Sequence, residues 1–174
     1  MISKLAPKYS FTSYKEISPG FLHRLGIRFL MIDLDNTLAK YSEHAPSVST
    51  ARWVDDMKAN NIDLYFISNS KRENRVDNFA YELDIPFTKN AEKPNPDSLY
   101  RAIRDSGYKI SESAFLGDQV FTDTLAANRA GVISIIVRPL SLKNPLLLLR
   151  YLAEIPFRTI CAIKRRKMKV QINE

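Results

Sequence analysis

Cysteine is nearly absent from this chain of 174 residues, which contains Cys161 alone. Cys161 therefore has no partner for an intramolecular disulfide or for a cysteine-based metal site, and this predicts a reducing compartment, the cytoplasm. Residues 1–10 carry lysines but no continuous apolar core, which is not the pattern of a secretory signal. The sequence also lacks internal repeats and low-complexity segments.

The sequence does contain enough apolar side chains for a core, and it has an excess of positive charge. Hydrophobic residues make up 45% of the chain, so we expect one domain that spans residues 1–174. Lysine and arginine total 26 against 19 aspartate and glutamate residues, which gives a net charge of +7. This excess predicts an anionic partner: a nucleic acid, an acidic lipid surface or a phosphorylated substrate.

Strand-like and helix-like patterns alternate through the middle of the chain. Short apolar runs without polar alternation are typical of strands buried on both faces, and they occur at 30–34, 64–68, 114–117 and 132–137. Helical patterns occur at 50–60, 72–83, 96–106 and 122–130. The alternation predicts an α/β fold, a Rossmann-like three-layer sandwich with a central parallel sheet and helices on both faces. The core is expected at about 26–140, with a basic amphipathic C-terminal segment at 141–174.

Two carboxylates follow the first predicted strand, in the hexapeptide DLDNTL at 33–38. Because one residue separates Asp33 from Asp35, both side chains leave the extended backbone on the same side and project into the loop beyond the strand. Such a pair is stable where a cation neutralises it or where one carboxyl stays protonated, and both situations belong to active sites. The alternative is a solvated turn of the Asp-Asn type, which we favour less directly after a buried strand.

Polar residues also follow the other predicted strands. Ser68 can donate its hydroxyl to a phosphoryl oxygen, although a serine at a strand end is more often only a turn residue. Lys93 precedes the third helix, where its ammonium either meets negative charge or is solvated. Asp118 ends the next strand, and Asp123 is either a first-turn acid of a helix or a supporting group of the site. In a parallel sheet these strand ends lie at one edge, where such folds place their sites.

Taken together, these segments resemble the four motifs of the haloacid dehalogenase (HAD) superfamily, over roughly Phe29 to Val137. The matching segments are DLDNTL with Asp33 and Asp35, FISNS with Ser68, EKPNP with Lys93, and GDQVFTD with Asp118 and Asp123. The short spacings and the GDQ form of the fourth motif resemble the small subclass III (IIIA) phosphatases, in particular the branch that contains phosphatidylglycerophosphate phosphatases.

The resemblance implies a Mg²⁺-dependent phosphomonoester hydrolase that acts through an aspartyl-phosphate. Asp33 is expected to be the nucleophile, and Asp35 the acid that protonates the leaving oxygen and then deprotonates the incoming water. The expected Mg²⁺ ligands are Asp33, Asp118 and the backbone carbonyl of Asp35, since Mg²⁺ prefers hard oxygen ligands.

The same resemblance assigns phosphate binding to Ser68, Asn69 and Lys93. Asp123 is expected to support Lys93 or a metal-bound water.

Many relatives of this superfamily insert a cap domain over the site. Only 39–49 and 71–92 are available here, enough for a loop and one helix, so we expect a capless HAD core with an open site. An open site suits a phosphate on something large, and phosphatidylglycerophosphate is the expected substrate. The alternatives are a phosphatase of a soluble metabolite or of a nucleic-acid end and, from another class, a catalytically inactive protein that binds RNA or a protein partner.

The tail combines apolar residues with regularly spaced charges. Arg150, Glu154 and Arg158 follow one another at four-residue spacing and are expected on one helical stripe. Pro156 is expected to break the helix, and the segment is too charged for a membrane span. A basic cluster follows at 164–169, and an apolar face beside such a cluster is typical of a helix on an anionic membrane. The chain is therefore expected in the cytoplasm with peripheral contact at the inner membrane face; a helix packed on the sheet is the alternative, and nucleic acid is the less favoured partner.

Overall fold

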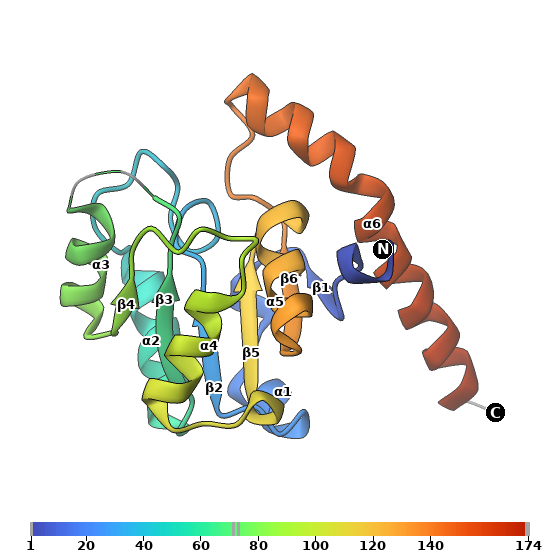
Figure 1. Ribbon diagram of the computed structural model, residues 1–174, viewed down its shortest axis with the longest axis horizontal. Coiled ribbons are helices and arrows are strands. Elements are labelled where there is room, and N and C mark those ends of the chain that lie inside the picture. The colour runs from blue at the N-terminus through green and yellow to red at the C-terminus, as the bar shows by residue number, and fades with distance from the viewer. Residues whose placement is uncertain (1, 71, 73, 173–174) are drawn as a thin grey trace.

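The computed structural model describes the backbone of residues 2–70, 72 and 74–172, and the side chains of residues 4–70, 72 and 74–159. Its centre is a parallel sheet with six strands in the order β1-β6-β5-β2-β3-β4 (Figure 1). Helices cover both faces of this sheet. The predicted three-layer α/β sandwich is confirmed.

The four inner strands come from the apolar runs of the sequence. They are β2 (Phe29–Ile32), β3 (Asp63–Ile67), β5 (Ser113–Gly117) and β6 (Ile133–Val137). Successive side chains of a strand point to opposite faces, so Leu30 and Ile32 of β2 join one core while Phe29 and Met31 join the other. Burial on both faces explains why these runs lack polar alternation.

Helices on the two faces pack against these two cores. One face carries α1 (Pro19–Arg24), α2 (Val48–Ala59) and α3 (Arg75–Leu83), and the other carries α4 (Asp97–Ser106) and α5 (Leu125–Ala130). A π-helical turn at Val120–Thr124 precedes α5, and short 3₁₀ turns lie at Ile2–Leu5, Tyr14–Glu16 and Ile110–Glu112. Gly131 ends α5 with a positive φ of 78°, a backbone conformation in which glycine is unstrained.

Two edge strands lie outside the predicted pattern. β1 (Tyr9–Phe11) pairs with β6, and β4 (Phe87–Thr88) pairs with β3. Strands of three and two residues are too short to give a recognisable apolar run. The N-terminal stretch is therefore part of the sheet, although it lies before residue 26.

The C-terminal segment forms one long helix, α6 (Pro145–Ile172), outside the β1 edge of the sheet (Figure 1). The expectation that Pro156 breaks this helix is wrong, because the helix continues through it. Proline removes one hydrogen bond of a helix. Ion pairs of Glu154 with Arg150 at 3.9 Å and with Arg158 at 3.0 Å span the same turns and stabilise them.

No helix in the part of the chain that the structure describes is long and apolar enough to cross a membrane. Cys161 and the basic cluster at 164–169 belong to the stretch whose side chains are outside the described residues.

Candidate active site

The segments that follow four neighbouring strands, β5, β2, β3 and β4, bring the predicted residues together, at the upper edge of the sheet in Figure 1. Ile32 lies beside Leu116 in the sheet, and the N–H of Asp33 donates to the carbonyl oxygen of Leu116 at 2.8 Å. Six of the seven predicted site residues line one cavity of about 430 Å³, namely Asp33, Asp35, Ser68, Asn69, Lys93 and Asp123. The seventh, Asp118, is buried next to this cavity, with a carboxylate oxygen within 4.8 Å of those of Asp33 and Asp123.

The ammonium of Lys93 lies at the centre of this group, and its side chain is 1% exposed. Its Nζ lies 2.5 Å from Oδ1 of Asp33 and 2.9 Å from Oδ1 of Asp123, and it donates to the carbonyl oxygen of Ile67 at 2.9 Å. Burial alone lowers the pKa of Lys93, but the charges of Asp123 and Asp33 outweigh this and raise the pKa above its usual value. Lys93 is therefore a permanent buried cation.

Two carboxylates contact this ammonium, and a third, that of Asp118, has an oxygen within 4.8 Å of theirs, so carboxylates outnumber the ammonium in this cluster. Burial raises the pKa of Asp33 to about 7, with Lys93 opposing the shift and Asp123 adding to it. Burial, together with the charges of Asp123 and Asp33, also raises the pKa of Asp118. Burial and mutual repulsion make it unfavourable for all these carboxyl groups to be ionised at once, and a bound divalent cation would remove this penalty. Carboxylate oxygens are ligands that Mg²⁺ prefers.

Thr37 lies between two of these carboxylates, and its position in the sequence predicts no role for it. Its hydroxyl oxygen lies 3.4 Å from Oδ2 of Asp33 and 3.3 Å from Oδ1 of Asp118, and the side chain is fully buried. A hydroxyl has one proton, so Thr37 can donate to either carboxylate. The only signal in the sequence is its place inside the first motif.

Asp123 is held against the backbone of the strand end. Its Oδ2 accepts the N–H of Gln119 at 3.0 Å, and a Cβ on Gly117 would lie 2.4 Å from that same oxygen. Only glycine fits at position 117, because any other residue would displace the carboxylate that contacts Lys93. Asp123 can therefore occupy this position only because Gly117, the last residue of β5, has no side chain.

Asp35 faces the same cavity, but its carboxylate is held by a residue that sequence reasoning missed. The Nε of Arg75, at the start of α3, lies 2.6 Å from Oδ1 of Asp35, and both residues are buried. Arg75 also donates to the carbonyl oxygens of Lys40, at 2.8 Å, and of Glu43. Arg75 lies 40 positions after Asp35 and belongs to no recognisable motif. Its contact with Asp35 could therefore not be predicted from the sequence.

Ser68 and Asn69 lie at the end of β3. The hydroxyl oxygen of Ser68 accepts the N–H of Ser70 at 3.0 Å, which leaves its proton to donate elsewhere. The carboxamide of Asn69 exchanges two hydrogen bonds with the backbone of Lys93, both at 3.0 Å. Asn69 thus fixes the segment that carries Lys93, and its predicted contact with phosphate stays a prediction.

Helix α6 supports the loop of the fourth motif from outside. Arg158 donates to the carbonyl oxygen of Asp118 and, at 3.1 Å, to that of Val137. The buried Glu154 accepts the N–H of Phe121 at 3.2 Å. The charged stripe of α6 therefore faces the protein and fixes the backbone around Asp118.

A buried aspartate cluster with one lysine, at the carboxyl edge of a parallel sheet, defines a class of hydrolase. Residues 21–131 match the family of haloacid dehalogenase-like hydrolases, and the chain belongs to this family. It is 31% identical over 150 residues, 86% of each chain, to the Bacillus subtilis (strain 168) protein named "Probable phosphatase YqeG". The predicted superfamily and the predicted enzyme are confirmed, and the phosphatidylglycerophosphate branch stays a prediction.

Solved structures share the fold at low sequence identity. One is the 3-deoxy-D-manno-octulosonate 8-phosphate phosphatase from Yersinia pestis, with a TM-score of 0.53, 17% identity and coverage of 74% of this chain and 71% of that chain. Another is a protein described as a subfamily III A hydrolase of the HAD superfamily from Legionella pneumophila, with a TM-score of 0.51, 18% identity and coverage of 74% and 73%. Both support the α/β fold.

Proposed function

We propose that this hydrolase removes the phosphate from phosphomonoesters, with Asp33 as nucleophile and Mg²⁺ as cofactor. One observation carries the proposal: the buried ammonium of Lys93 contacts both Asp33 and Asp123 while Asp118 lies beside them. Phosphoryl transfer depends on positioning and on charge compensation, and this arrangement supplies both.

The residues divide the reaction into two steps. Asp33 attacks phosphorus, the bond from phosphorus to the leaving oxygen breaks, and Asp35 gives that oxygen its proton. In the second step Asp35 accepts a proton from the water that attacks the aspartyl-phosphate, which releases phosphate and restores the carboxylate of Asp33. Arg75 keeps the carboxyl group of Asp35 on the cavity wall throughout.

The cluster fits a divalent cation because the carboxylate oxygens of Asp33, Asp118 and Asp123 lie within 4.8 Å of one another. Asp33, Asp118 and the backbone carbonyl of Asp35 would hold Mg²⁺, and the ion would offset the negative charge of the phosphate and of the nucleophile. Ser68 donates to a phosphoryl oxygen, and Asn69 and Asp123 hold Lys93 in place.

We further propose that the substrate is phosphatidylglycerophosphate and that α6 places the enzyme on an anionic membrane surface. The charged stripe of α6 faces inward, and apolar residues beside it on the helix face outward: Leu149, Leu152 and Ile155 are 67%, 51% and 40% exposed. Leu147 and Arg150 of the same helix line cavities at the site, which places this apolar surface next to the reacting groups. An apolar helix surface followed by a basic cluster is typical of interfacial helices.

A soluble phosphate ester is the second candidate. The volume of about 430 Å³ at the catalytic site is within the range of pockets that take a whole small metabolite. The Yersinia pestis neighbour bears the name of a phosphatase for a sugar-acid phosphate.

The decisive experiment measures phosphate release from a panel of esters, with Mg²⁺ and with EDTA. The panel contains phosphatidylglycerophosphate in vesicles, sugar phosphates and 5′-phosphorylated oligonucleotides. We expect turnover with Mg²⁺ only, fastest on the lipid, and turnover at background level for Asp33→Asn, which removes the nucleophile but keeps the shape of the side chain. Asp55→Asn, on the exposed side of α2, is the matched control. Release by Asp33→Asn at the wild-type rate would show that the nucleophile is wrong, and fastest turnover of a sugar phosphate would favour the second candidate.

A further inference from the structure

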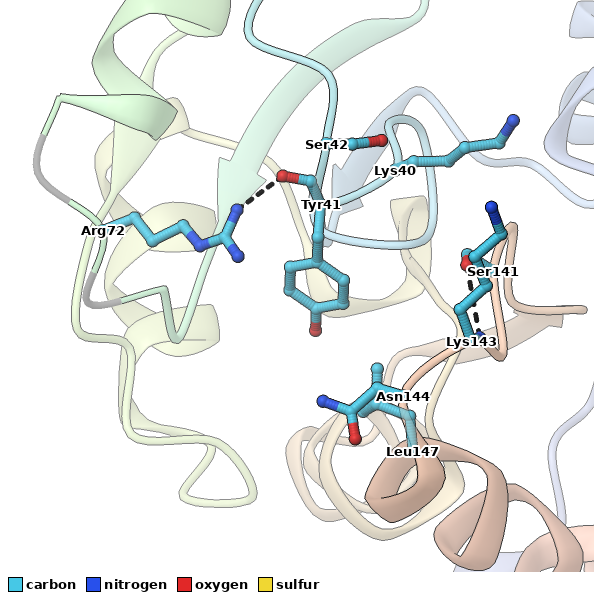
Figure 2. Close-up of a pocket in the computed structure, with 8 residues that line it drawn as sticks. All are labelled: Lys40, Tyr41, Ser42, Arg72, Ser141, Lys143, Asn144 and Leu147. Carbon is cyan, nitrogen blue, oxygen red and sulfur yellow. Dashed lines mark hydrogen bonds between the residues drawn. The ribbon is translucent and has the colours of Figure 1, made fainter.

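A second cavity, of about 490 Å³, adjoins the catalytic one (Figure 2). The two cavities have Tyr41 and Arg72 in common, so these residues form the boundary between them. The guanidinium of Arg72 lies 5.1 Å from the centre of the Tyr41 ring, and Arg72 donates to the carbonyl oxygen of Tyr41 at 2.5 Å. A group attached to a phosphate at Asp33 can therefore extend past Tyr41 into the second cavity.

The second cavity is positively charged. The eight described residues that line it include Lys40, Arg72 and Lys143 and contain no acidic side chain. Within the described residues, none of these three cations forms an ion pair. Figure 2 shows Arg72 on one side of the Tyr41 ring and Lys143 with Ser141 on the other. Cations on both sides of a cavity whose described lining has no acidic side chain favour an anionic occupant.

One wall of this cavity is fixed to the catalytic acid. Arg75 pairs with Asp35 at 2.6 Å and at the same time donates to the carbonyl oxygens of Lys40, at 2.8 Å, and of Glu43. The loop that carries Lys40 and Tyr41 is thus held by the same guanidinium that positions Asp35.

The opposite wall is fixed to the first motif as well. The carboxamide of Asn36 donates to the carbonyl oxygen of Ser141 at 2.7 Å and accepts its N–H at 2.9 Å. The backbone carbonyl of Asn36 also accepts the N–H of Leu140 at 2.9 Å. Since Asn36 follows Asp35 directly, both walls hold a defined position relative to the reacting groups.

We infer that this cavity is a subsite for a second anionic group, a phosphate diester or monoester, on the leaving part of the substrate. The inference rests on the proposed phosphomonoesterase function and adds a substrate class to it: esters that carry two phosphates. The same chemistry is found in a phospholipid head group and in a soluble bisphosphate. Lys40 and Lys143 bind the second phosphate, while Arg72 lies between the two sites and contacts either group.

The test compares esters with one and with two anionic groups, at constant ionic strength and with Mg²⁺. Glycerol 1-phosphate has one phosphate, glycerophosphoglycerol phosphate adds a diester, and fructose 1,6-bisphosphate adds a second monoester. For Lys40→Gln/Lys143→Gln, we expect the ratio of kcat/KM for two-phosphate esters to that for glycerol 1-phosphate to fall about tenfold, mainly through KM, since hydrogen bonds to charged groups are lost. A fall for glycerophosphoglycerol phosphate alone indicates a lipid head group, and a fall for both esters indicates recognition of any second phosphate; each supports the subsite.

The control is Arg101→Gln/Lys109→Gln, which removes two exposed charges away from both cavities. A ratio in Lys40→Gln/Lys143→Gln equal to that in this control would overturn the subsite while leaving the hydrolase function in place. Calorimetric titration with glycerophosphoglycerol, which has the diester but no scissile phosphate, separates the two proposals further. If the wild type hydrolyses no ester yet binds this diester more tightly than Lys40→Gln/Lys143→Gln does, the proposed function fails and the subsite stands.

Discussion

At the scale of single residues, the site depends on charges that are buried and mutually compensated. Lys93 uses its three donors on Asp33, Asp123 and a backbone carbonyl, and each of these contacts comes from a different strand end. Removing one member of such a cluster leaves the others buried without compensation, which is strongly destabilising. The residues that surround these charged groups are therefore best tested by substitutions that change one hydrogen bond or one contact and keep every charge of the cluster.

Thr37→Val makes such a change, because valine has nearly the same shape and lacks the hydroxyl. Without the donor, the carboxylates of Asp33 and Asp118 repel each other more strongly and are less well oriented. We expect kcat to fall about tenfold, as for the loss of a hydrogen bond to a charged group, and the Mg²⁺ concentration for half-maximal activity to change. Thr37→Ser keeps the hydroxyl and is the matched control. Equal activity of the valine and serine variants would contradict this role of Thr37.

Gly117→Ala tests the contact between the strand backbone and Asp123. The new methyl group would lie 2.4 Å from Oδ2 of Asp123, so the carboxylate must move away from Lys93. We expect a loss of about 2 kcal/mol or more in the free energy of unfolding, together with reduced turnover. Gly20→Ala in α1 is the control, since the nearest atom there is 3.8 Å from the added methyl group. Denaturant unfolding of both variants is the measurement, and a Gly117→Ala protein as stable as Gly20→Ala would refute the argument.

The raised pKa of Asp33 predicts how the metal-free protein responds to pH. Its usual value is 3.8 and its value in the folded protein is about 7. Between the two, the folded state holds a proton that the unfolded chain has released, so the free energy of unfolding falls as pH rises through this interval. Mg²⁺ competes with that proton, and its stabilising effect therefore grows with pH.

Thermal unfolding in EDTA and in Mg²⁺, from about pH 4 to about pH 8, measures both effects. Asp33→Asn has no carboxyl group to titrate at this position. In EDTA, its stability should therefore decrease less than that of the wild type as pH rises. A metal-free wild type that loses no more stability than Asp33→Asn over this interval would contradict the shift.

At the scale of elements, long apolar runs were predictable and short or tertiary features were not. β2, β3, β5 and β6 lie within three residues of their predicted bounds, because a doubly buried strand must be apolar throughout. β1 and β4 pair through backbone groups, which leave no pattern in so few residues. The continuation of α6 through Pro156 depends on Glu154 and Arg158, whose contacts with the body of the protein exist only in the fold.

The candidate site divides in the same way. The polar residues at the strand ends were identifiable because a parallel sheet places its carboxyl ends together. There Lys93 contacts Asp33 and Asp123, and a carboxylate oxygen of Asp118 lies within 4.8 Å of theirs. Arg75 could not be found, since its role depends on the position of α3 relative to the first motif. The second cavity needs the loop at 40–43 and the start of α6 together, which no local pattern reveals.

Two truncations distinguish the role of the first half of α6 from that of the second half. A chain that ends at Leu140 lacks Glu154 and Arg158, so the loop around Asp118 loses its hydrogen bonds. We expect such a chain to lose activity on soluble and lipid esters alike and to be less stable by about 3 kcal/mol or more. A chain that ends at Thr159 keeps these contacts and should hydrolyse soluble esters normally, with weaker binding to anionic vesicles because the basic cluster is gone. Wild-type activity of the Leu140 truncation on a soluble ester would show that α6 does not support the site.

At the scale of the whole molecule, the orientation of α6 is unusual. A surface helix normally turns its apolar stripe to the core and its charges to water. Here the stripe of Arg150, Glu154 and Arg158 faces the protein, because it forms hydrogen bonds with the loop of the fourth motif, and leucines remain outside. The exposed apolar surface of α6 lies beside both cavities, which Leu147 and Arg150 of this helix line. A membrane that covers this surface would therefore also lie next to the catalytic site.

Leu149→Gln/Leu152→Gln tests this arrangement without touching either cavity. Both side chains are more than half exposed, so the free energy of unfolding should change little, whereas the loss of two leucines that enter a bilayer should reduce vesicle binding at least about tenfold. The measurement is flotation with vesicles that contain anionic lipid, at low and high salt, alongside hydrolysis of a soluble ester. Tyr81→Gln/Ile110→Gln removes two exposed apolar side chains far from α6 and should float like the wild type. If Leu149→Gln/Leu152→Gln floats as well as this control, lipid does not cover α6, and the soluble ester becomes the better substrate class.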